Sequence, residues 1–151
     1  MKTPFVTKAM VDEITKTYPT PFHIYDEKGI RENAERLYQA FSWNKGYREF
    51  FAVKATPNPF ILKLLASVGC GTDCSSLTEA CGITGESVMF SSNATPAEDY
   101  LYARKLGAII NLDDFTHIDF LDKLTGLPEK ICCRYNPGRF AISNSIMDDP
   151  S

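Results

Sequence analysis

The chain has 151 residues, enough for one domain with its own core, and 44% of them are hydrophobic and 23% charged. Its net charge of −3 argues against nucleic acid or an anionic membrane surface as a partner, and no apolar run is long enough to span a membrane. Because the N-terminus has no signal-peptide core, we expect a cytoplasmic protein. The five cysteines form no Cys-x-x-Cys pair and lie far from both histidines in the sequence, so we expect no metal site.

Helices and strands are predicted in alternation. The first half contains a helix over 7–18, a short strand at 22–25, a helix capped by Asp26, a strand that ends at Lys54, and a helix capped by Asn58 with Pro59 at its first position. The second half contains strands at 71–75, 87–92, 108–112 and 130–135, with a helix opened by the Thr95–Glu98 capping box and another capped by Asp113 or Asp114.

This alternation with short loops predicts an α/β fold with a parallel sheet, which fits both an open doubly wound sheet and a (β/α)₈ barrel. The first strand lacks a G-x-G-x-x-G sequence after it, which argues against a dinucleotide-binding fold. Polar residues gather at the carboxyl ends of the predicted strands, which favours the barrel: Lys54, Asp73, Ser75, Ser92, Asn93, Arg134 and Asn136.

Only about five of the eight strands that barrel closure requires are predicted. We therefore expect an N-terminal part of a longer protein, with a barrel truncated before closure. Residues 1–20 are predicted to form an N-terminal helical segment, and residues 21–151 the first part of the barrel domain.

Lys54 is the most informative residue of the chain, because it ends an apolar strand and is followed at once by Pro57-Asn58-Pro59. A lysine in an apolar interior must reach a polar cavity or lose its proton. A desolvated amine is a nucleophile that forms Schiff bases with carbonyl cofactors such as pyridoxal phosphate (PLP). Taken alone, a lysine at a strand end more often reaches solvent; Asp73 at the next strand end favours the nucleophile.

Residues 51–58 resemble the lysine motif of the fold-type III PLP enzymes, the alanine-racemase-like barrels that include diaminopimelate, ornithine and arginine decarboxylases. Three further segments agree with that family in order and spacing: residues 20–26, 71–79 and 133–138. The resemblance extends from about residue 21 to residue 142 and is strongest to the diaminopimelate decarboxylases.

The resemblance implies a role for four residues. Lys54 would be the Schiff-base lysine, Asp73 would lie close to the cofactor and the lysine, and Arg134 would line the same pocket. Glu79 would pair with the pyridine nitrogen and keep it protonated, although the segment after it is shorter than in the family. On spacing alone, Asp73 and Glu79 fit a turn acid and a helix-face acid equally well.

The function implied for the full-length protein is PLP-dependent decarboxylation of meso-2,6-diaminopimelate to L-lysine and CO₂, by a homodimer acting on a small amino-acid substrate. Two alternatives stay open: a decarboxylase for another basic amino acid or polyamine precursor, and a non-catalytic PLP-carrier barrel. The 151 residues alone are expected to be inactive, because the family's phosphate-binding and substrate-binding residues fall beyond Ser151.

Overall fold

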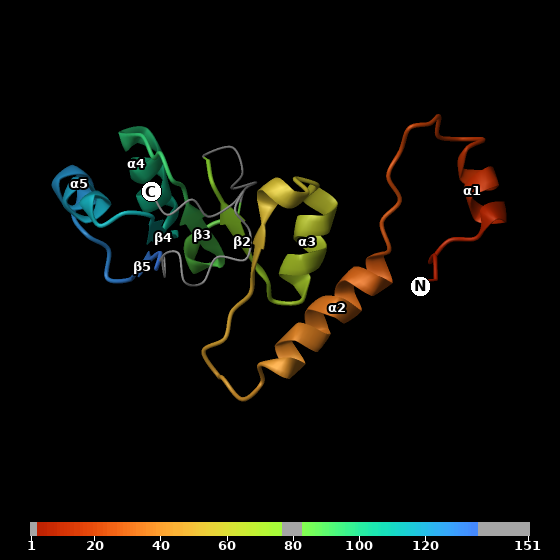
Figure 1. The fold of residues 1–151 in the computed structure, drawn as a ribbon, viewed down its shortest axis with the longest axis horizontal. Helices are drawn as coiled ribbons and strands as arrows, with labels where there is room; N and C mark the ends of the chain where they lie inside the picture. The colour runs from red at the N-terminus through yellow and green to blue at the C-terminus, as the bar shows by residue number, and fades with distance from the viewer. Residues whose placement is uncertain (1–2, 77–82, 136–151) are drawn as a thin grey trace, which may run out of the picture.

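The computed structural model describes residues 3–76 and 83–135 (Figure 1). Its helices are α1 (Lys8–Ile14), α2 (Glu27–Ala40), α3 (Pro59–Ser67), α4 (Ala97–Leu106) and α5 (Thr116–Thr125). Its strands are β1 (Phe50–Ala52), β2 (Gly71–Cys74), β3 (Val88–Ser91), β4 (Ile109–Leu112) and β5 (Ile131–Cys133). Two single 3-10 turns, η1 (Val53–Ala55) and η3 (Gly85–Ser87), lie at the end of β1 and the start of β3.

The five strands form one parallel sheet in the order β1-β2-β3-β4-β5. Each new strand is added to the same edge, so the described strands contain no reversal of order. A doubly wound sheet would reverse at a switch point, whereas a (β/α)₈ barrel adds its strands in sequence. The topology therefore decides between the two predicted folds in favour of the barrel arrangement.

The two faces of the sheet differ in burial. Alternate residues of the three central strands are buried against the helices: Thr72, Cys74, Val88, Phe90, Ile110 and Leu112. They pack with Leu62 of α3, Tyr100 and Ala103 of α4, and Leu121 of α5. The residues between them, including Asp73, Ser91 and Asn111, are only partly buried and point to the opposite face. In a barrel arrangement this opposite face is the one that lines the interior.

Two helix starts agree with the sequence prediction. The Asp26 carboxylate accepts a 3.0 Å hydrogen bond from the backbone N–H of Gly29 at the start of α2. The Asn58 side chain accepts one from Phe60 at the start of α3, where Pro59 occupies the first helical position. Both caps satisfy backbone donors that the helix itself leaves free.

The predicted capping box at Thr95 is wrong, because the Thr95 hydroxyl donates to the carbonyl of Ser92 and α4 has no side-chain cap. At α5 the N-cap position is Phe115, which has no side-chain cap, but one of the two predicted acids does bond at the helix start. Asp114 accepts a 2.8 Å hydrogen bond from the backbone N–H of Thr116, whereas Asp113 is engaged elsewhere.

The N-terminal part of the chain departs most from prediction. Residues 22–25 form no strand, because they make no ladder with any strand in the described part of the chain. The first helix ends at Ile14 rather than near residue 18 and has no buried residue. Figure 1 shows α1 set apart from the sheet and joined to α2 by an irregular segment. A helix this short with no packed face gains little from tertiary contacts.

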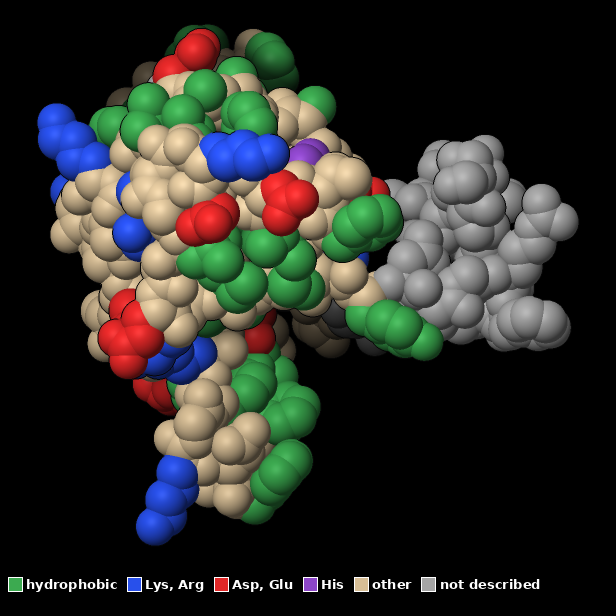
Figure 2. Space-filling model, turned by 90° about the vertical axis from the view of Figure 1, so that its left-hand side faces the viewer, with side chains coloured by type: hydrophobic (Ala, Val, Ile, Leu, Met, Phe, Trp, Pro, Cys, Tyr) green, Lys and Arg blue, Asp and Glu red, His purple; other side chains and the backbone are tan. Residues whose placement is uncertain are grey.

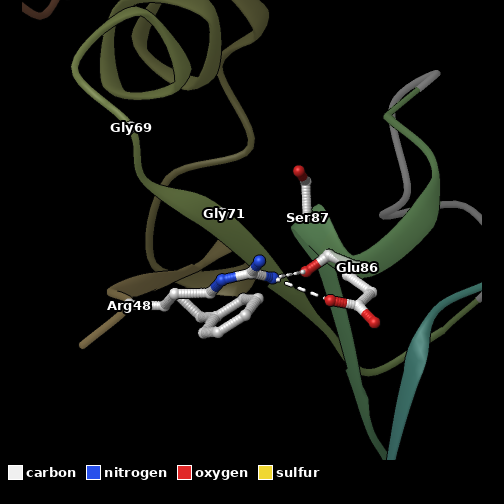
Figure 3. Close-up of a pocket in the computed structure, with 6 residues that line it drawn as sticks. Arg48, Gly69, Gly71, Glu86 and Ser87 are labelled. Atoms are coloured by element: carbon white, nitrogen blue, oxygen red, sulfur yellow. Dashed lines mark hydrogen bonds and ion pairs between the residues drawn. The ribbon is translucent and has the colours of Figure 1, made fainter. Parts of the chain in front are cut away.

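A cluster of charges ties together the amino ends of β1, β3 and β5. Glu86, just before β3, forms ion pairs with Arg48 at 3.3 Å and Lys130 at 2.6 Å. Figure 3 shows the Arg48 side chain reaching across β2 at Gly71 to the carbonyl and carboxylate of Glu86. Because β2 lies between β1 and β3, this contact joins two strands that are not neighbours in the sheet.

The outer surface over α4 and α5 is mixed in character. Figure 2, viewed from the α5 end, shows acidic and basic side chains interspersed with apolar ones. Within residues 3–76 and 83–135 no helix has the length and apolar character required to cross a bilayer.

Gly71→Ala is expected to destabilise the protein. A Cβ at this position would lie 2.6 Å from both the Phe50 ring and the backbone carbonyl of Ser87, so a strand must shift. Overpacking of this kind costs about 1–3 kcal/mol. Denaturant unfolding would measure the loss. Gly46→Ala is the control, because its Cβ meets only ordinary contact at 3.5 Å; equal stability of the two variants would contradict the prediction.

Glu86→Gln is expected to remove a stabilisation that depends on pH. Lys130, through its hydrogen bond and its charge, lowers the pKa of Glu86 below its ordinary value of 4.5, and Arg48 adds to the effect. A carboxylate whose pKa is lower in the folded state than in the unfolded state stabilises the folded state. This stabilisation is complete at a pH above the unfolded-state pKa, and it is lost as the pH falls through the folded-state pKa. The difference in unfolding free energy between the two proteins should therefore be greatest near neutral pH and shrink in acid.

Glu35 supplies the matched control for Glu86, since it is exposed and forms no ion pair with any described residue. The difference in unfolding free energy between Glu35→Gln and the unsubstituted protein should stay close to zero both at neutral pH and in acid. High salt should reduce the effect of Glu86→Gln, because the pairs are exposed. A loss that is the same in acid and at neutral pH would contradict the electrostatic origin.

Candidate functional site

A polar cavity of about 360 Å³ lies at the carboxyl ends of the strands. Its lining comes from the ends of β1, β2, β3 and β5: Lys54, Asp73, Ser75, Ser91, Ser92, Asn93 and Arg134. In barrel enzymes this end of the strands carries the chemistry. Three of the four site residues predicted from the sequence, Lys54, Asp73 and Arg134, are thus brought together around one cavity.

Lys54 lies on the turn η1 rather than on the strand itself. The β1–β2 ladder ends at the pair Ala52 and Asp73, and the backbone N–H of Thr56 then bonds to the carbonyl of Val53 to close the turn. Val53 is fully buried, whereas Lys54 is exposed and lines the cavity. Of the two predicted outcomes the structure shows the first: Lys54 reaches a polar cavity and is not desolvated, because the side chain leaves the strand at its open end.

Asp73 is placed by the register of β2 on the partly buried face of the sheet. Its Oδ1 atom is buried and has no hydrogen-bond partner among the described residues. A buried carboxylate oxygen without a partner is costly unless another group supplies a donor. Because Asp73 faces the cavity beside Lys54, a ligand in that cavity is the natural source of the donor.

Ser91, at the end of β3, is a cavity residue that the predicted set of polar strand ends lacks, whereas Ser92 belongs to that set. Ser91 lines the cavity and accepts a 3.2 Å hydrogen bond from the side-chain amide of Asn111 on β4. The period-two pattern of β3 carries the signal that could have found it, because Val88 and Phe90 are buried and Ser91 must then face the other side.

Arg134 follows β5 and forms an ion pair with Asp113, with Nη1 and Oδ1 2.7 Å apart. The sequence predicted Asp113 as a possible helix cap. Its ion pair with Arg134 follows only from the pairing of β4 with β5.

Glu79 and Asn136 lie outside the described residues, so their predicted places at the site stay predictions. The cavity itself contains two cations, Lys54 and Arg134, and one anion, Asp73. With the surrounding hydroxyl and amide groups, this set of donors suits an anionic ligand with several polar substituents.

The residues fit a small phosphorylated aldehyde such as PLP. The volume falls within the roughly 300–1,000 Å³ of small-molecule sites. Lys54 offers an amine for the aldehyde carbon, and the unpartnered oxygen of Asp73 offers an acceptor for a polar ring substituent. Arg134 and the serine hydroxyls offer donors for ligand oxygens.

Comparison with known proteins agrees with this fit. The family described as "Pyridoxal-dependent decarboxylase, pyridoxal binding domain" matches residues 27–146. Protein TabA of Pseudomonas amygdali pv. tabaci is 41% identical over 91% of this chain, and diaminopimelate decarboxylase of Thermoplasma acidophilum is 32% identical over 85% of it. The chain spans about a third of the length of these relatives, 33% and 32% respectively.

Solved structures show the same arrangement. Lysine decarboxylase of Selenomonas ruminantium superposes on 90% of this chain with a TM-score of 0.76 and 25% identity, over 38% of its own chain. Diaminopimelate decarboxylase of Helicobacter pylori, complexed with L-lysine, covers 76% of this chain and 30% of its own, with a TM-score of 0.63 and 29% identity. The chain therefore belongs to the pyridoxal-binding domain family of the PLP-dependent decarboxylases.

Proposed function

We propose that the protein containing this chain decarboxylates meso-2,6-diaminopimelate to L-lysine and CO₂, with PLP bound at the cavity of Lys54. The observation that carries this proposal is the convergence of Lys54, Asp73 and Arg134 on one polar cavity at the carboxyl ends of the strands. The diaminopimelate decarboxylases at about 30% identity support the choice of substrate.

Each cavity residue has a proposed task. The Lys54 amine would hold the cofactor at its aldehyde carbon, and Asp73 would accept a hydrogen bond beside it. Arg134 and the hydroxyls at the end of β3 orient polar oxygens of the ligand. Bound PLP supplies an electron sink for the pair of electrons left when CO₂ departs.

Glu79 is proposed to hold a proton on the pyridine nitrogen, as the resemblance to the family implies. The residues that read the substrate are proposed to come from outside residues 1–151. A homodimer is proposed on the same resemblance, since members of the family complete their site across a dimer interface.

A second candidate is a decarboxylase for lysine or ornithine. One observation favours it: the lysine decarboxylase of Selenomonas ruminantium superposes with a TM-score of 0.76, against 0.63 for the diaminopimelate decarboxylase of Helicobacter pylori. Both enzymes contain the same type of domain, so the choice depends on the assay below.

Lys54→Ala is expected to abolish covalent capture of PLP, because no other described residue that lines the cavity carries a primary amine. The protein expressed from its complete gene would be incubated with PLP, reduced with borohydride and mapped by peptide mass spectrometry. Lys63→Ala, at an exposed position of α3, is the matched control and should keep the label on Lys54. A label on another lysine in the unsubstituted protein would refute the assignment.

Release of CO₂ is expected to be fastest with meso-diaminopimelate. The purified PLP-bound protein would be assayed with meso-diaminopimelate, lysine, ornithine and arginine at equal concentrations. A preference for lysine or ornithine would favour the second candidate. Tight PLP binding with no CO₂ release from any of the four would instead favour a PLP-carrier protein.

A further inference from the structure

The sheet register places Asp113 and Arg134 side by side. The β4–β5 ladder pairs Leu112 with Cys133, and the backbone N–H of Arg134 donates a 2.9 Å hydrogen bond to the Leu112 carbonyl. The residue that follows β4 is Asp113, whose Oδ1 lies 2.7 Å from Nη1 of Arg134. The pairing of the two strands thus places the two side chains next to each other.

The pair is partly shielded from water. The Asp113 side chain is 22% exposed and the Arg134 side chain 47% exposed. Burial raises the pKa of Tyr100 on α4; the Thr95 hydroxyl opposes this, and the negative charge of Asp113 adds to it. The Asp113 carboxylate is therefore close enough to the core to act on Tyr100, which is only 1% exposed. Charge pairs in such surroundings are screened less than pairs on an open surface.

A second carboxylate competes for Arg134. Asp73 lines the same cavity, and its buried Oδ1 has no hydrogen-bond partner among the described residues. A guanidinium carries five N–H donors and binds carboxylates strongly. Without Asp113, the carboxylate that remains for Arg134 among the described residues of this cavity is Asp73.

We propose that Asp113 is a positioning residue that holds Arg134 at the β4 side of the cavity and thereby keeps Asp73 free for Lys54 and the ligand. Asp113 does not line the cavity itself, so it acts through Arg134. This inference rests on the proposed function, because it takes the cavity as the PLP site.

The chain provides a matched control in the adjacent residue. Asp114 has the same charge, but its carboxylate binds the backbone N–H and the hydroxyl of Thr116 at the start of α5. Asp114→Asn removes one negative charge next to the site without touching the pair of Asp113 and Arg134. Any effect of net charge alone would appear in both variants.

The test is a double-mutant cycle on PLP affinity, measured on the protein expressed from its complete gene. Asp113→Asn is expected to weaken PLP binding roughly tenfold, because Arg134 then captures Asp73 and the ligand loses one charge-assisted hydrogen bond to that carboxylate. Asp114→Asn should stay within about threefold of the unsubstituted protein. In an Asp73→Asn background, Asp113→Asn should have almost no further effect, because Arg134 then has no carboxylate to capture.

A merely structural role for Asp113 would give additive losses, since general loosening does not depend on the charge of Asp73. Additive losses, or equal affinities for Asp113→Asn and Asp114→Asn, would overturn the inference while leaving PLP binding at Lys54 intact. Absence of PLP binding in the unsubstituted protein would overturn the proposed function and the inference together.

Asp113→Glu provides a second variant in case Asp113→Asn does not fold. It keeps the carboxylate and should bind PLP within about threefold of the unsubstituted protein. Thermal unfolding of each variant would accompany the titrations. A tenfold loss with a well-folded Asp113→Glu, persisting in the Asp73→Asn background, would also count against the inference.

Discussion

The register of the parallel sheet is the constraint on which the rest of the structure depends. Side chains alternate between the two faces of each strand, so a slip of one residue in any strand would exchange the buried face for the cavity face. In β2 such a slip would put Asp73 among the helices and Cys74 in the cavity. The apolar residues at alternate positions prevent this, because moving Phe90 or Ile110 out of the core would expose large hydrophobic side chains.

Because all the described strands run in parallel, their carboxyl ends lie at one end of the sheet and their amino ends at the other. The carboxyl end carries the polar cavity, with one cation on the turn after β1 and another after β5. At the amino end, Arg48, Glu86 and Lys130 connect alternate strands through exposed ion pairs. None of these three residues lines the cavity, so the ion pairs at the amino end involve no residue of the site.

The sequence predicted correctly those features that depend on residues close together in the chain. The caps at Asp26 and Asn58 needed only the residues of one turn, and the alternation of strands and helices predicted the convergence of Lys54, Asp73 and Arg134. The choice between Asp113 and Asp114 was beyond such signals, because both fit a helix cap equally well. Arg134 on the neighbouring strand decides it, and that neighbour follows from the pairing of β4 with β5.

The cavity draws its two cations from the first and the last described strands of the sheet. Parallel strands pair only after a helical crossover has formed, which makes such contacts slow relative to local ones. During synthesis, Lys54 leaves the ribosome well before β5, and domains form from the N-terminal side first. The cavity is therefore incomplete until β5 docks on β4, so Arg134 joins Lys54 and Asp73 late in folding, and a ligand that needs the guanidinium cannot be held before then.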